Sequence, residues 1–109
     1  MFTKHTDEGY HTPLAGIRQK TLVYGEKTLM TAFLLEKDSA LPRHRHPHEQ
    51  TGYLVSGSIR LFVDGVSQDC TAGDSWCIPS NAEHGAEILE DAVAIEVFSP
   101  VREDYLPSK

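Results

Sequence analysis

Three of the six histidines of the chain lie within residues 43–50, in the sequence RHRHPHEQ. Side chains two residues apart in an extended segment project from the same face, so His44 and His46 point the same way and Gln50 is in phase with them. Neutral imidazole nitrogens bind Zn, Mn, Fe, Co and Ni, and a carboxamide oxygen is a harder, weaker donor that completes such a site. The spacing therefore predicts one divalent metal ion held by these three side chains.

A fourth donor must come from another part of the chain. His84 is the predicted donor, because it follows a short strand-like run and a turn at Pro79. His48 has the same parity as His44 and His46, so spacing alone does not exclude it as a ligand. The competing interpretation of the histidines is an exposed basic strand, and that of Gln50 is a buried side chain bonded to the backbone.

The elements that must position these side chains have the pattern of strands. Helical periodicity is hard to find, whereas short β-rich runs recur between turn residues. Asp64 and Gly65 predict a two-residue type I′ hairpin, since both positions of that turn require positive φ. Many short antiparallel strands indicate an all-β sandwich or barrel, and a closed barrel has no exposed edges. The predicted strands are 20–24, 28–35, 50–56, 58–63, 66–70, 75–78, 84–89 and 92–98.

Length and composition limit the possible partners. The 109 residues are enough for one domain with its own core. A formal net charge of −6 repels polyanions, so no nucleic-acid partner is expected. No apolar run reaches the ~20 residues of a membrane span, and the N-terminus lacks the apolar stretch of a secretory signal. We therefore expect a cytoplasmic protein without membrane association.

The remaining features carry little chemistry. Residues 1–15 show no clear pattern and are predicted to form an N-terminal arm, followed by a barrel domain at 16–109. Cys70 and Cys77 are separated by six residues, a spacing that matches neither a redox pair nor a zinc ribbon. We expect both cysteines to be small buried apolar residues.

On these residues the chain resembles the cupin superfamily. The first cupin motif, HxHxxx(E/Q) with a later glycine, is matched by His44, His46, Gln50 and Gly57, and the second, GxxxxxPxxxxH, by Gly73, Pro79 and His84. The resemblance implies a double-stranded β-helix, which is a jelly-roll β-barrel, with a metal bound by His44, His46, Gln50 and His84. It makes His48 a bystander and implies a homodimer formed by packing sheets and exchanging N-terminal strands.

Two positions depart from the usual cupin pattern. Asn81 replaces a frequent glycine of the second motif, and Gln50 stands where many cupins have Glu. A neutral ligand in place of an anionic one leaves the metal complex with one more positive charge. That charge should strengthen the Lewis acidity of the metal and weaken its binding.

A narrower resemblance, from residue 16 to 106, is to the KdgF-like pectin-degradation proteins. It is carried by residues 46–50 (HPHEQ) and 96–106 (EVFSPVREDYL). The resemblance implies an acidic residue, a phenylalanine and an arginine beside the metal, which fall on Glu96, Phe98 and Arg102. Glu96 takes the place of the more usual Asp. The plainer alternatives are a solvent-facing Glu96, a core Phe98 and a surface Arg102.

Members of that group convert 4,5-unsaturated uronic acids into linear 5-keto-4-deoxyuronate. The resemblance thus implies a small unsaturated sugar acid as substrate, with the metal coordinating substrate oxygens and stabilising the enolate. In this hypothesis Glu96 moves the protons, Arg102 pairs with the carboxylate and Phe98 supports the sugar ring. A metal-dependent oxygenase and a non-catalytic ligand-binding module remain as alternatives, because the fold alone fixes no function.

Overall fold

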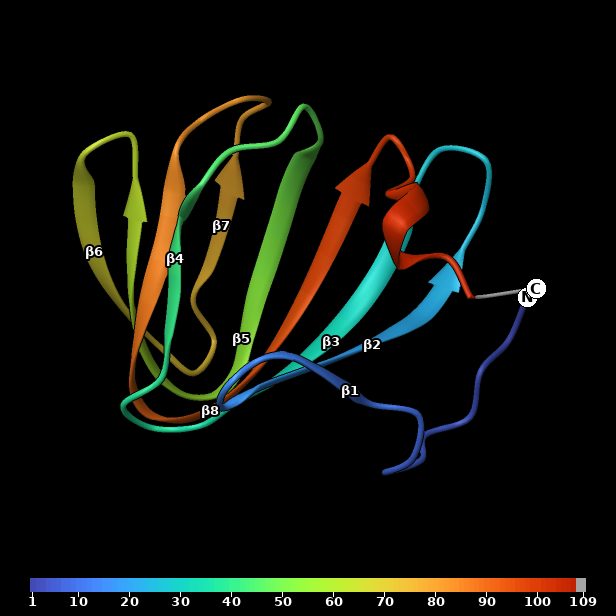
Figure 1. Ribbon diagram of the computed structural model, residues 1–109, viewed down its shortest axis with the longest axis horizontal. Helices are drawn as coiled ribbons and strands as arrows, with labels where there is room; N and C mark the ends of the chain where they lie inside the picture. The colour runs from blue at the N-terminus through green and yellow to red at the C-terminus, as the bar shows by residue number, and fades with distance from the viewer. Residues whose placement is uncertain (108–109) are drawn as a thin grey trace.

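The computed structural model describes residues 1–107, so the last two residues of the predicted 16–109 domain lie outside the described part of the chain. The described residues form an antiparallel all-β protein with a single turn of 3-10 helix, as predicted (Figure 1). The strands are β1 (His11–Leu14), β2 (Ile17–Tyr24), β3 (Leu29–Leu35), β4 (Ala40–His44), β5 (Glu49–Val63), β6 (Val66–Thr71), β7 (Ser75–Ile78) and β8 (His84–Ser99), and the 3-10 turn is η1 (Glu103–Tyr105).

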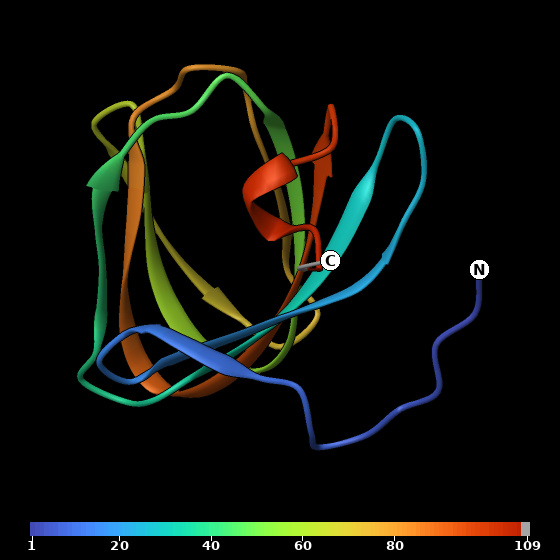
Figure 2. The ribbon, with the colours of Figure 1, turned by 45° about the vertical axis from the view of Figure 1, so that its right-hand side comes forward.

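Two long strands, β5 and β8, organise the barrel. They pair from Glu49 opposite Ser99 to Val63 opposite His84. The first half of β5 and the second half of β8 lie between β7 and β3, and β2 and β1 continue this sheet. The other halves of the two strands lie between β6 and β4 (Figure 1). The two sheets enclose the core, which gives the jelly-roll barrel visible in Figure 2.

The prediction of two separate strands in place of each long strand is wrong. The register of β5 against β8 shifts between Leu54 and Ile59, so the turn-like residues there form a bulge and bend rather than a strand end. Gly57 lies at this bend with a φ of 84°, and an added Cβ would overlap the backbone of Asp91 and Ala92. Glycine is required there because the two strands approach so closely.

Two strands were not predicted from the sequence. β4 contains Pro42 and is largely exposed, so it shows no apolar alternation, yet it pairs with the start of β8. β1 lies within the predicted 1–15 arm and pairs with β2. The arm is also tied to β2 by Lys20, whose Nζ donates to the carbonyls of Thr6 and Glu8.

Local predictions have mixed outcomes. The Asp64–Gly65 hairpin is confirmed, with φ values of 47° and 80° at the two turn residues and Val63 opposite Val66. Cys70 is buried, but Cys77 is exposed, because its neighbours on β7 are the ones that point into the barrel. Both thiols are free. In residues 1–107 no helix is long and apolar enough to span a bilayer.

Candidate metal centre

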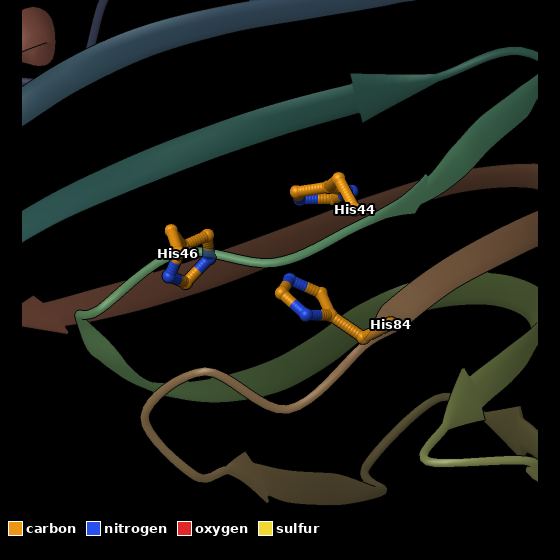
Figure 3. A group of neighbouring side chains, drawn as sticks. All are labelled: His44, His46 and His84. Atoms are coloured by element: carbon orange, nitrogen blue, oxygen red, sulfur yellow. The ribbon is translucent and has the colours of Figure 1, made fainter.

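Three histidines from two segments converge at the inner face of the barrel. His44 ends β4, His46 follows it in the loop, and His84 begins β8 directly opposite His44. The candidate ligand nitrogens of the three side chains lie within 4.8 Å of one another. Figure 3 shows the rings gathered around a common space, and the ring centroids of His44 and His84 are 4.2 Å apart.

The backbone fixes which nitrogen of each ring faces this space. Nδ1 of His44 lies 2.8 Å from the carbonyl of Pro42, and Nδ1 of His84 lies 2.8 Å from that of Ala82. Nδ1 of His46 makes the same contact with the carbonyl of His48 at 3.0 Å. A carbonyl only accepts hydrogen bonds, so each Nδ1 carries the proton and each Nε2 keeps a lone pair.

The Nε2 lone pairs need a hydrogen-bond donor or a cation to interact with. Nε2 of His84 is buried and has no hydrogen-bond partner among residues 1–107. Burial lowers the pKa of His84 and of His46, so both rings stay neutral, which is the form that binds metals. Three convergent imidazole nitrogens, oriented by hydrogen bonds on their far side, fit a divalent metal ion of the late first-row series.

Gln50 lies beside the histidine cluster on β5. Its Oε1 is 3.1 Å from Nε2 of His46, and its side chain is almost completely buried. Both atoms are acceptors when Nδ1 of His46 carries the proton, so the contact is unfavourable without a cation between the two lone pairs. Both acceptors could bind one divalent ion placed between them. The structure thus brings all four predicted ligands together, and His48 lies outside the cluster.

Glu96 points into the barrel from β8, so the alternative of a solvent-facing side chain is wrong. The carboxyl is 7% exposed and lies next to Gln50 and Trp76. Nε1 of Trp76 donates to both carboxyl oxygens, at 3.1 and 3.3 Å. Burial raises the pKa of Glu96 to about 8, against the opposing effect of hydrogen bonds from Gln50 and Trp76.

Phe98 and Arg102 lie at the same end of the barrel. Phe98 is fully buried, as the core alternative expected, yet its ring also packs edge-on against His46 at 5.8 Å between centroids. The Arg102 guanidinium lies against both rings of the Phe98–Tyr105 pair, 5.0 Å from the centroid of Phe98 and 3.9 Å from that of Tyr105, and the two ring centroids are 5.4 Å apart. Its Nε and Nη2 donate to the carboxylate of Asp104, at 3.2 and 2.7 Å.

One cavity connects these groups. Its lining includes Arg102 and Tyr105, from the segment that follows β8. Its polar wall contains His44, Gln50, His84, Glu96 and Arg102, and its other walls are largely apolar. The sequence analysis did not find Trp76 and Tyr105, which also line it. Trp76 could have been predicted, because it lies two residues before the apolar Ile78 and so shares its face of β7. Tyr105 lies in no periodic pattern that would have marked it.

The two flanking arginines of the histidine segment do not face the cavity. Arg43 lies over the ring of Phe62, 5.0 Å from its centroid. Arg45 is exposed and pairs with Glu83, with 3.4 Å between the charged atoms.

A jelly-roll barrel with three histidines and a glutamine converging on its inner face defines the cupin class. The model of the cupin domain family matches residues 32–99, and the chain belongs to this family. Over 93 residues it is 30% identical to the pectin degradation protein KdgF of Dickeya dadantii (strain 3937), and the match covers 84% of each chain.

Solved structures agree with this relationship. The chain superposes on KdgF from Halomonas sp. with a TM-score of 0.92 and 27% identity, covering 97% of this chain and 98% of that one. It superposes on an RmlC-like cupin from Shewanella frigidimarina NCIMB 400 with a TM-score of 0.91 and 30% identity, covering 96% and 95% of the two chains.

Proposed function

We propose that this cupin is a metal-dependent isomerase that opens 4,5-unsaturated uronates to linear 5-keto-4-deoxyuronates. The observation that carries the proposal is the buried side chain of Glu96 on the same cavity as His44, His84 and the Arg102 guanidinium. Apolar packing does not explain an inward-facing acid next to a cation site. The similarity to KdgF, which is a pectin degradation protein, gives the substrate class.

The proposed ligands are His44, His46, Gln50 and His84, and the ion is Ni, Zn, Mn, Fe or Co. A divalent ion held there supplies Lewis acidity toward substrate oxygens. Because Gln50 is neutral, the centre keeps more positive charge than one with a Glu ligand. The protein contributes the orientation of the ligands through the three backbone carbonyls that accept from the imidazoles.

Arg102 is the proposed binding group for the substrate carboxylate. Asp104 accepts from its Nε and Nη2, and among residues 1–107 Nη1 has no hydrogen-bond partner, so its N–H groups can donate to a second carboxylate. The guanidinium also packs against the rings of Tyr105 and Phe98, which restricts its movement. Phe98 at the same time offers the ring of the sugar an apolar surface.

Glu96 is the proposed acid–base group. It takes the proton of the anomeric hydroxyl as the bond between C1 and the ring oxygen breaks, and it returns a proton to C4 as the C5 oxygen becomes a ketone. One proton leaves oxygen and one reaches carbon, so the reaction is an isomerisation without a co-reactant. A single carboxyl can serve both transfers, first as a base and then as an acid.

The test is the loss of ultraviolet absorbance of the enol ether when metal-loaded protein meets unsaturated galacturonate or mannuronate monomers. We expect rapid decay with the wild type, and decay at background rate with His46→Ala and Arg102→Ala. Glu96→Gln should keep its metal and lose turnover. Full activity of Glu96→Gln would refute the role of that residue, and a metal-loaded wild type without activity would refute the function.

We also propose a homodimer. The outer face of β5 exposes Tyr53 and Val55, each about half accessible, which suits the packing of two sheets. Sedimentation equilibrium at micromolar concentration is expected to give twice the chain mass, and a mass near 12.1 kDa would contradict the proposal.

A further inference from the structure

Trp76 makes a specific contact that neither cupin motif explains. It is the only tryptophan of the chain, and its indole lies on the cavity side of β7. An indole N–H donates and does not accept, so the two distances of 3.1 and 3.3 Å describe one N–H shared between both oxygens of Glu96.

The contact crosses an intervening strand. Gly52 on β5 is opposite Trp76 on β7 and also opposite Glu96 on β8, so the three residues form one row across the sheet. Any side chain at the middle position would separate the outer two. A Cβ added to Gly52 would overlap the indole nitrogen of Trp76 and the carboxyl of Glu96. The glycine therefore opens the path along which the indole reaches the carboxyl.

The contact also restricts how Glu96 can turn. The carboxyl receives the Trp76 N–H from one side of the row, and its other polar neighbour is Gln50, two residues before Gly52 on the same face of β5. Without the indole donor, the flexible Glu side chain would be held at the Gln50 side alone. A displacement of about 1 Å at a reacting group can cost about a hundredfold in rate.

We infer that Trp76 is a positioning residue, whose indole N–H reaches across Gly52 and holds the Glu96 carboxylate in the orientation that faces the substrate. The effect on catalysis rests on the proposed function of Glu96. The contact itself is independent of which substrate the protein takes.

Kinetics of Trp76→Phe test the catalytic consequence, because phenylalanine keeps an aromatic wall and removes the N–H. We expect kcat to fall at least about tenfold while KM changes by less than about twofold, since the lost donor acts on the carboxylate rather than on the substrate. In a Glu96→Gln background the same substitution should cause no further loss. Tyr53→Phe, on the outer face of β5 beside Gly52, is the matched aromatic control and should keep the wild-type kcat.

Fluorescence tests the contact without any turnover. Because Trp76 is the only tryptophan, the emission spectrum reports its surroundings alone. We expect the emission maximum to shift in Glu96→Gln and in Gly52→Ala. It should stay unchanged in Glu87→Gln, whose exposed side chain pairs with Arg60. Thermal melts and metal content of each variant show whether the fold and the site are intact.

The outcomes separate this inference from the proposed function. Wild-type kcat in a folded, metal-loaded Trp76→Phe, or an equal loss from Trp76→Phe with and without Glu96, would overturn the positioning role. If the wild type turns over no uronate, the proposed function fails. In that case an unshifted emission in both Glu96→Gln and Gly52→Ala overturns the contact, and a shift in both supports it.

Discussion

Metal binding should raise the thermal stability of the protein, and His84 should be required for the effect. His84 is 4% exposed, and its Nε2 has no partner among the described residues. An unsatisfied buried polar atom costs about 1–3 kcal/mol, and a bound ion removes that cost. At a free metal concentration of 100 times Kd, binding to the folded state adds about 2.7 kcal/mol to the free energy of unfolding.

The expected shift follows from the size of the chain. In a domain of about 100 residues, 1 kcal/mol moves Tm by roughly 4 °C, so saturating metal should raise Tm by about 10 °C over protein treated with a chelator. His84→Ala should abolish this shift. Without metal, His84→Ala should change Tm much less than it does with metal. The loss of packing lowers stability, whereas removal of the unsatisfied nitrogen raises it, so the two effects partly cancel.

The assay is a thermal melt of wild type and variants, with chelator and with each candidate metal. His48→Ala is the matched control. The residue lies in the same histidine-rich segment with its ring 5.5 Å from that of His46, but outside the ligand cluster, so this variant should keep the full shift. If metal leaves the Tm of the wild type unchanged, or if it still raises the Tm of His84→Ala, the assignment of this cluster as a metal site is refuted.

Three further predictions concern the cavity, the bend and the buried acid. Tyr105→Ala should raise KM about tenfold with a smaller change in kcat, since the Arg102 guanidinium loses the ring 3.9 Å away that fixes it; an unchanged KM would contradict this. Gly57→Ala should lower the free energy of unfolding by more than about 2 kcal/mol in urea titrations, because of its positive φ and close strand contact. In metal-free protein the free energy of unfolding should fall between pH 5 and pH 8 for the wild type relative to Glu96→Gln. The folded pKa of Glu96, about 8, lies above the ordinary value of 4.5, so its protonated form stabilises the fold at low pH and that stability is lost as pH rises. Parallel urea titrations of the two proteins at several pH values check this. The same dependence of the free energy of unfolding on pH in both proteins would contradict it.

The sequence predicted residue types and parity better than it predicted pairing. His44, His46, Gln50 and His84 were predicted as ligands from residue type and local spacing, and the structure places their side chains close together. Glu96 was predicted to face inward from its parity and the family pattern, and it is buried. β4 was missed, since an exposed strand with a proline carries no alternating signal. The row from Trp76 through Gly52 to Glu96 was also missed, because it depends on the register of three strands, which no local pattern encodes.

The strand pair β5–β8 links the candidate metal centre to Glu96, the proposed acid–base residue. β8 carries His84 at its start and Glu96 near its end, and the bend at Gly57 folds the pair so that both side chains face one cavity. Gln50 and Gly52 hold the matching positions on β5, opposite Phe98 and Glu96. The paired strands β5 and β8 therefore set the positions of Gln50 and His84 relative to Glu96, whereas His46 lies in the loop that follows β4. A cupin that keeps the histidines but changes the residues at the end of β8 would retain the metal and change its chemistry, so the specificity of this protein should be sought in Glu96, Phe98 and the segment that follows them.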